Sequence, residues 1–173
     1  MTLTRSWWLL IAIVAGIIGV MTWAFWHYTQ DDVFITFTYS RNIAEGVGFV
    51  FNPGERVQGT TTPLWALVMA GVYTITPELL HAGNLIAGML LLLIVIIVRT
   101  LLRNDVHALT QVALVLLIVS SPIFYISYGM ETLLYCTILV TAWLCWVRDR
   151  RAWAMLAAAA LTWTRADGVV LGG

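Results

Sequence analysis

Two adjacent carboxylates, Asp31 and Asp32, open a long polar interval in an otherwise apolar chain. They follow an apolar segment. A charged pair at a membrane boundary costs free energy, so its presence indicates a functional site. In the first turn of a helix, the helix dipole favours an anion by about 0.3–1 kcal/mol. An ionised carboxylate can remove the proton of a hydroxyl group, so the pair is a candidate catalytic base. The alternative is that both acids cap the helix and face solvent.

A second set of ionisable residues lies late in the chain. Arg165 and Asp167 interrupt an apolar run, and Glu131 begins another run directly after the Gly129-Met130 pair. Ionisable residues in such runs are rare unless they pair or face a polar cavity. Arginine is suited to bidentate binding of phosphate, which makes Arg165 a candidate phosphate ligand. The alternatives are an internal salt bridge from Arg165 to Glu131 or Asp31, and a helix-capping role for Glu131.

The composition identifies the class of protein. Of the 173 residues, 61% are hydrophobic and only 10% are charged, and the mean hydropathy is +0.89. These values exclude an ordinary soluble domain and indicate a polytopic membrane protein in contact with membrane lipids. The chain has no lysine and no basic cluster, so no nucleic-acid partner is expected. Cys136 and Cys145 share one apolar segment and indicate neither a disulfide framework nor a metal site.

Apolar runs divided by polar turns predict the membrane-spanning helices. Residues 6–26 form a run of 21 residues, long enough to cross a hydrocarbon core of about 30 Å. Four further spans are predicted at 81–98, 108–125, 132–147 and 153–171. The sequence therefore predicts an all-α polytopic membrane protein with about five transmembrane helices, in which residues 1–173 form a single transmembrane domain.

The interval 27–80 is predicted to be the first external loop, with helices of its own. Residues 31–45 can form a helix along the membrane surface, with Phe34 and Phe37 on one side. Residues 63–75 are apolar, but as a helix they reach only about 20 Å. This segment is therefore predicted to be re-entrant or interfacial.

The arginines test this topology. If 63–75 does not cross, six of the nine arginines fall on one side of the membrane: Arg5, Arg99, Arg103, Arg148, Arg150 and Arg151. The positive-inside rule then puts the N-terminus in the cytoplasm and the acids near the outer face of the cytoplasmic membrane. Counting 63–75 as a full crossing would split the arginines between the two sides.

Three stretches, DDVFITFTYSRNIAEGVGFVFNPGERVQGTTTPLW at 31–65, SSPIFYISYGMETLLY at 120–135 and TRADG at 164–168, resemble successive signatures of the GT-C superfamily of membrane glycosyltransferases. The similarity is strongest to bacterial members such as arabinofuranosyltransferases, and more distant to aminoarabinose and protein mannosyl transferases. The resemblance implies transfer of a sugar, usually with inversion, from a polyprenyl-phosphate carrier to a cell-envelope glycan or lipid at the outer face. It implies no cofactor, although a divalent metal is left open.

The resemblance also assigns roles to residues. Asp31 matches the catalytic base, with Asp32 beside it as an acceptor or donor ligand. Glu131 and Arg165 match the acid after a GMET-like sequence and the basic residue that holds the carrier phosphate, which Asp167 would help to orient. Arg41 is a further substrate-binding candidate, although it can equally snorkel.

Two departures from the family pattern bear on these assignments. Ala166 stands where relatives often have proline. Family members usually continue through further membrane helices, so the chain is predicted to be the N-terminal part of such an enzyme. Two other classes of function are open: a non-catalytic membrane protein that binds a lipid carrier or a partner subunit, and a small transporter.

Overall fold

The computed structural model describes residues 5–55, 57, 59–102 and 107–165, and this part of the chain contains helices and no strand. The helices are α1 (Arg5–Ala24), α2 (Asp32–Ala44), α3 (Pro63–Tyr73), α4 (Leu79–Leu102), α5 (Ala108–Ser120), α6 (Pro122–Ile126), α7 (Thr132–Val147) and α8 (Arg151–Thr164). The chain is an all-α membrane protein, which confirms the predicted fold class.

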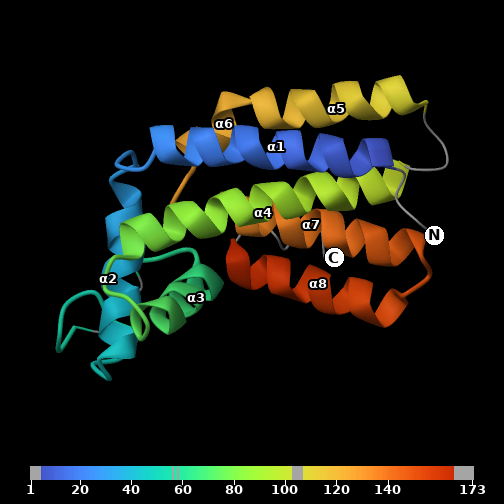
Figure 1. Cartoon of the computed structure of the whole chain (residues 1–173). Helices are drawn as coiled ribbons and strands as arrows, with labels where there is room; N and C mark the ends of the chain where they lie inside the picture. Colours follow the sequence, from blue (N-terminus) through green and yellow to red (C-terminus); the bar gives the residue numbers. More distant parts are fainter. Residues whose placement is uncertain (1–4, 56, 58, 103–106, 166–173) are drawn as a thin grey trace.

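Five helices form an elongated bundle and two lie at one of its ends. Figure 1 shows α1, α4, α5, α7 and α8 running side by side, with α2 across the end of the bundle and α3 beside it. The central helix, α4, contacts α1, α3, α5 and α7. The predicted loop 27–80 thus forms a helical cap on the bundle, which we call the α2–α3 cap.

Three segments of the described chain are long and apolar enough to cross a membrane: Trp7–Ala24, Leu79–Leu102 and Ala108–Ile126. Helix α7 is also apolar, but its 16 residues reach only about 24 Å. Helix α3 has 11 residues, or about 17 Å, and cannot span by itself. The short α3 packs against α2 in the cap.

Two predicted spans differ in detail from the structure. The span predicted at 108–125 is found as the apolar segment Ala108–Ile126, but its helix is broken at Ser121, which is extended (φ −72°, ψ 116°), because the ring of Pro122 disfavours helical backbone in the preceding residue. The last helix ends at Thr164, and Arg165 is extended (φ −152°, ψ 146°), whereas the prediction continued the helix to 171. The extended backbone lets the Arg165 side chain meet a buried carboxylate from α7. The rest of that predicted span, 166–171, lies outside the described residues.

Two apolar cores hold the arrangement together. The larger one joins α1, α4, α5 and α7 through residues such as Val14, Leu91 and Val115. The smaller one joins the α2–α3 cap to the start of α4 through Val33, Phe37, Trp65, Met69 and Leu79.

One buried amide ties α1 to α4 at the end of the bundle that carries the cap. Asn84 Nδ2 donates to the carbonyl oxygens of Phe25 at 3.2 Å and Trp26 at 3.1 Å. Both carbonyls lie just after the end of α1, and the Phe25 carbonyl also accepts the Tyr28 N–H at 3.0 Å, so Asn84 adds a side-chain contact from α4 to this turn. This contact fixes where the chain leaves α1 and enters the cap.

Candidate active site

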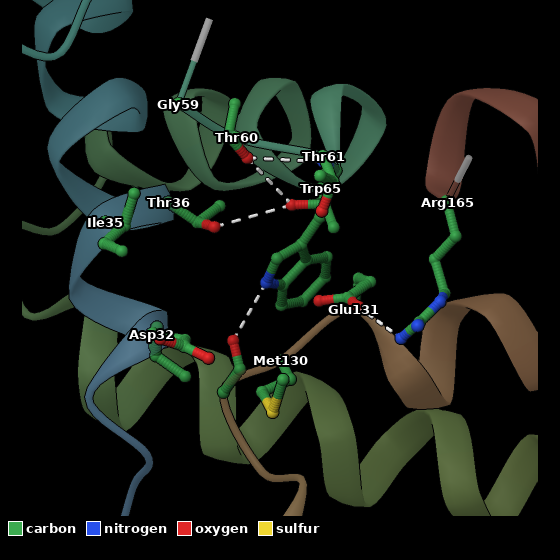
Figure 2. A pocket seen from close by; sticks show the side chains of 13 residues that line it. Asp32, Ile35, Thr36, Gly59, Thr60, Thr61, Trp65, Met130, Glu131 and Arg165 are labelled. Carbon is green, nitrogen blue, oxygen red and sulfur yellow. Dashed lines mark hydrogen bonds and ion pairs between the residues drawn. The ribbon is translucent and has the colours of Figure 1, made fainter. Parts of the chain in front are cut away.

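A cavity of about 370 Å³ lies where the α2–α3 cap meets the ends of α7 and α8. This volume is within the range of small-molecule sites. The cavity is lined by Asp32, Val33, Ile35, Thr36, Gly59, Thr60, Thr61, Thr62, Trp65, Gly129, Met130, Glu131 and Arg165. Four segments far apart in sequence therefore build one polar site at the end of an apolar bundle (Figure 2).

The two neighbouring acids are placed differently. Asp32 is the first residue of α2 and lines the cavity. Asp31 is the N-cap, makes no side-chain cap hydrogen bond and is not among the lining residues, although both acids are exposed. Asp32 is therefore the member of the pair whose carboxylate a ligand in the cavity can reach.

Glu131 and Arg165 form an ion pair on the side of the cavity away from Asp32. Arg165 Nη1 donates to Glu131 Oε1 at 2.9 Å, and 7% of the Glu131 side chain and 41% of the Arg165 side chain are exposed. The predicted internal salt bridge between these residues is thus present, and Glu131, the N-cap of α7, makes no side-chain cap hydrogen bond. Figure 2 shows Trp65 and Glu131 between Asp32 and Arg165.

The turn before α7 delivers Glu131 to the cavity. Gly129 has φ +81°, in the left-handed region that favours glycine. A Cβ atom there would lie 3.1 Å from Thr29 Oγ1 and 3.2 Å from Val33 Cγ1. The Gly129 carbonyl accepts the indole N–H of Trp65 at 2.8 Å, which joins α3 to this turn.

Threonine hydroxyls line a third part of the cavity. Thr36 on α2 and the consecutive Thr60, Thr61 and Thr62 all contribute. The segment that carries the last three is held by Tyr39, whose hydroxyl donates to the Val57 carbonyl at 2.8 Å and accepts the Gly59 N–H at 2.7 Å. Pro63 then begins α3 at its first position, where a missing N–H has no consequence.

The remaining sequence-predicted site residues are not brought to the cavity by the described structure. Arg41 is exposed in the last turn of α2, about 14 Å along the helix from Asp32, and does not line the cavity. Asp167 lies outside the described residues. No group of three or more His, Cys, Asp or Glu side chains that could hold a metal occurs in the part of the chain that the structure describes.

The threonines and Trp65 are not predictable as site residues from the sequence, because a TTTP run ordinarily indicates a turn followed by a helix start. Their contribution depends on contacts such as that between Trp65 and Gly129, 64 residues apart. The available signal was their position directly between the polar interval and a short apolar helix.

The chain is similar in sequence to part of a known protein. The chain is 29% identical over 163 residues to the terminal beta-(1->2)-arabinofuranosyltransferase of Mycobacterium tuberculosis. The match covers 85% of this chain and 26% of the relative, so the chain spans about a quarter of the length of the protein it matches. No family model matches the chain, and no solved structure matches it. The aligned part of the chain is thus similar to part of a known glycosyltransferase.

Proposed function

We propose that this chain carries the sugar-donor site of a membrane glycosyltransferase. The enzyme transfers a sugar from a polyprenyl-phosphate carrier to a hydroxyl of a cell-envelope glycan or lipid at the outer face of the cytoplasmic membrane. One observation carries the proposal: Asp32, Glu131 and Arg165 line a single cavity at the end of an apolar bundle. A lipid-linked phosphate needs such a boundary, with a polar site for its headgroup and apolar surroundings for its tail.

In the proposed reaction, the two sides of the cavity have different roles: one removes a proton from the acceptor, and the other binds the phosphate. Asp32 accepts the proton of the acceptor hydroxyl while that oxygen forms a bond to the anomeric carbon of the sugar. The bond between the anomeric carbon and the carrier phosphate oxygen breaks, and its electron pair leaves with the phosphate. Attack from the face opposite the phosphate inverts the anomeric centre. Arg165 stabilises the negative charge that develops on the phosphate in the transition state.

The ion pair supports this assignment of Arg165. Arg165 Nη1 donates to Glu131 Oε1 at 2.9 Å, and this contact with a buried carboxylate gives the guanidinium a defined orientation at the cavity. The arginine side chain is also the more exposed partner, so a phosphate can approach it without displacing the buried carboxylate. Glu131 therefore acts as the positioning residue of the pair.

The name of the relative suggests arabinofuranose as the first sugar to test. We would measure transfer of radiolabel from polyprenyl-phosphate arabinofuranose, and from carriers with other sugars, in membranes that contain the protein or its variants. Asp32→Asn should reduce transfer by about 100-fold or more, because removal of a general base typically has an effect of this size. Asp31→Asn is the matched control and should retain most of the transfer.

Equal transfer by wild type and Asp32→Asn would remove Asp32 as the base, and loss of transfer in Asp31→Asn alone would assign the role to its neighbour. Arg165→Ala should weaken binding of the carrier, whereas unchanged affinity would remove the phosphate role. Because the chain spans about a quarter of its relative, carrier binding without transfer by the wild type would favour the alternative of a non-catalytic carrier-binding module.

A further inference from the structure

Three buried threonine hydroxyls form a connected chain on one wall of the cavity. Thr36, Thr60 and Thr62 are 8%, 4% and 6% exposed. Thr62 Oγ1 lies 3.4 Å from Thr36 Oγ1 and 3.2 Å from Thr60 Oγ1, and the Thr62 N–H donates to Thr60 Oγ1 at 3.3 Å. We call these three residues the threonine wall. Figure 2 shows Thr36 on α2 and Thr60 on the facing segment, and the dashed hydroxyl contact of each runs to Thr62.

The threonine wall has hydrogen-bonding capacity left over. Three hydroxyls carry three O–H protons, and the two hydroxyl–hydroxyl contacts of the described residues use two of these protons. Each oxygen can also accept two hydrogen bonds, and these contacts fill only part of that capacity. Both contacts are longer than the usual 2.7–2.8 Å or so of an O–H···O bond, so they are weak. A buried hydroxyl with unused capacity is costly unless a polar partner in the cavity completes it.

The chemistry of the wall suits a neutral polyhydroxyl ligand. Hydroxyl groups both donate and accept, and the threonine protons can rotate to match a partner of either kind. The wall carries no charge, so it does not compete with Arg165 for a phosphate.

The wall is also held in place before any ligand arrives. Tyr39, fully buried, fixes the backbone on the N-terminal side of Thr60 through Val57 and Gly59. On the other side, Thr62 is the N-cap of α3 but makes no side-chain cap hydrogen bond, so its hydroxyl is not committed to the helix. Preorganised groups of this kind lose little conformational entropy on binding.

We propose that Thr36, Thr60 and Thr62 bind hydroxyl groups of the donor sugar and thereby favour the sugar-bearing carrier over the bare carrier. This inference rests on the proposed function, because it assigns the sugar of that donor to the space between Asp32 and Arg165. Thr60 and Thr62 are specificity-determining residues in this assignment.

The test compares carriers that differ only in the sugar. Affinities of the purified protein in lipid nanodiscs are measured for bare polyprenyl phosphate and for polyprenyl phosphate bearing arabinofuranose, mannose or aminoarabinose. The wild type should bind at least one sugar-bearing carrier about 10-fold or more tighter than the bare carrier. For that carrier, Thr62→Val and Thr60→Val should each weaken binding about 3- to 10-fold, the effect of losing one or two hydrogen bonds. Affinity for the bare carrier should not change.

Two further variants separate binding from folding. Thr62→Ser keeps the hydroxyl and should retain the preference for the sugar-bearing carrier. Thr38→Val is the matched control on α2, because Thr38 does not line the cavity and donates to the Phe34 carbonyl at 2.8 Å. It should leave both affinities unchanged.

The outcomes also separate this inference from the proposed function. If every carrier binds as tightly as bare polyprenyl phosphate, or if the Thr→Val variants weaken both kinds equally, the threonine wall is no sugar subsite, although the carrier site stands. If the wild type binds neither bare nor sugar-bearing carriers, the proposed function fails and this inference fails with it.

Discussion

The two ends of the helix bundle use arginine in different ways. At the cavity end, Arg165 meets the buried carboxylate of Glu131 at 2.9 Å. At the opposite end, Arg99 lies 3.8 Å from the centre of the Trp7 ring, and Arg151 lies 3.9 Å from that of Trp146. Figure 1 places the end of α4 and the α7–α8 turn together at this opposite end.

The difference follows from what surrounds each guanidinium. Arg151 lies over an indole with its side chain half-exposed and also pairs with the exposed Asp149 at 2.8 Å, whereas Arg99 lies over an indole but is buried. Arginine paired with a buried acid keeps a defined orientation toward a cavity. One end of the bundle therefore pairs its guanidinium with a buried acid beside a cavity, whereas the other holds its guanidinium groups against indoles.

The largest expected effect concerns the orientation of the bundle in the membrane. Each end of the bundle should be either fully accessible or inaccessible to a reagent outside the cell. In a variant with Cys136→Ala and Cys145→Ala, we would add Glu78→Cys at the cavity end or Arg148→Cys at the opposite end, both at exposed positions. A membrane-impermeant maleimide applied to intact cells should label Glu78→Cys, and should label Arg148→Cys only after permeabilisation. The positive-inside rule gives the direction. The reverse pattern would put the cavity on the cytoplasmic side.

The next largest effect is expected at the turn before α7. Gly129→Ala forces a left-handed backbone on alanine, at about 1–2 kcal/mol, and brings its Cβ against Thr29 and Val33. Gly54→Ala is the matched control, because Gly54 has φ +87° but nothing within 4 Å of the added Cβ. Thermal unfolding in detergent should show the larger loss for Gly129→Ala, with loss of carrier binding as well. Equal losses would mean that crowding at Gly129 is unimportant.

A third prediction compares two buried tyrosines, one in the cap and one in the bundle. Tyr39→Phe removes the hydroxyl that holds Val57 and Gly59, and Tyr125→Phe removes a 2.7 Å hydrogen bond to the Val119 carbonyl. Each should lower the free energy of unfolding by about 1 kcal/mol. Only Tyr39→Phe should weaken binding of the sugar-bearing carrier, since it frees the segment that leads to Thr60. A similar loss of affinity in Tyr125→Phe would show that the bundle and the cap are not separable.

The helices were predictable from the sequence wherever a single local pattern determines where a helix begins and ends. Apolar length determines the bundle helices, and α7 has the predicted bounds, Thr132–Val147. Pro122 is a sequence signal for the break at Ser121, but the continuous apolar run around it favoured the prediction of a single helix. Arg165 was identified from its charge in an apolar setting, and its extended backbone was not, because that conformation accompanies a contact with Glu131, 34 residues away.

The cavity was less predictable than the elements that build it. Adjacent acids carry no information about which one faces inward; the start of α2 and its packing on α3 decide that Asp32 does. Arg41 has the same charge as Arg165, but its place along α2 carries it away from Asp32. Hydroxyls such as Thr36 become notable only when Thr62 is folded against them.

The smallest expected effect is at the far side of the cap, where Tyr73 on α3 donates to Glu45 Oε1 at 2.9 Å. This hydrogen bond raises the pKa of Tyr73 above its usual 10, and Arg41 acts in the opposite direction. Because the pKa is higher in the folded state, the contact stabilises the cap below pH 10 or so and is lost as the pH rises through the folded pKa. The difference in phenolate absorbance between wild type and Tyr73→Phe should therefore titrate above pH 10, and Glu45→Gln should move that titration down. If Glu45→Gln leaves it in place, the hydrogen bond between Tyr73 and Glu45 does not persist in solution, and the cap is held by its apolar core and by the hydrogen bonds of Trp65 and Tyr39.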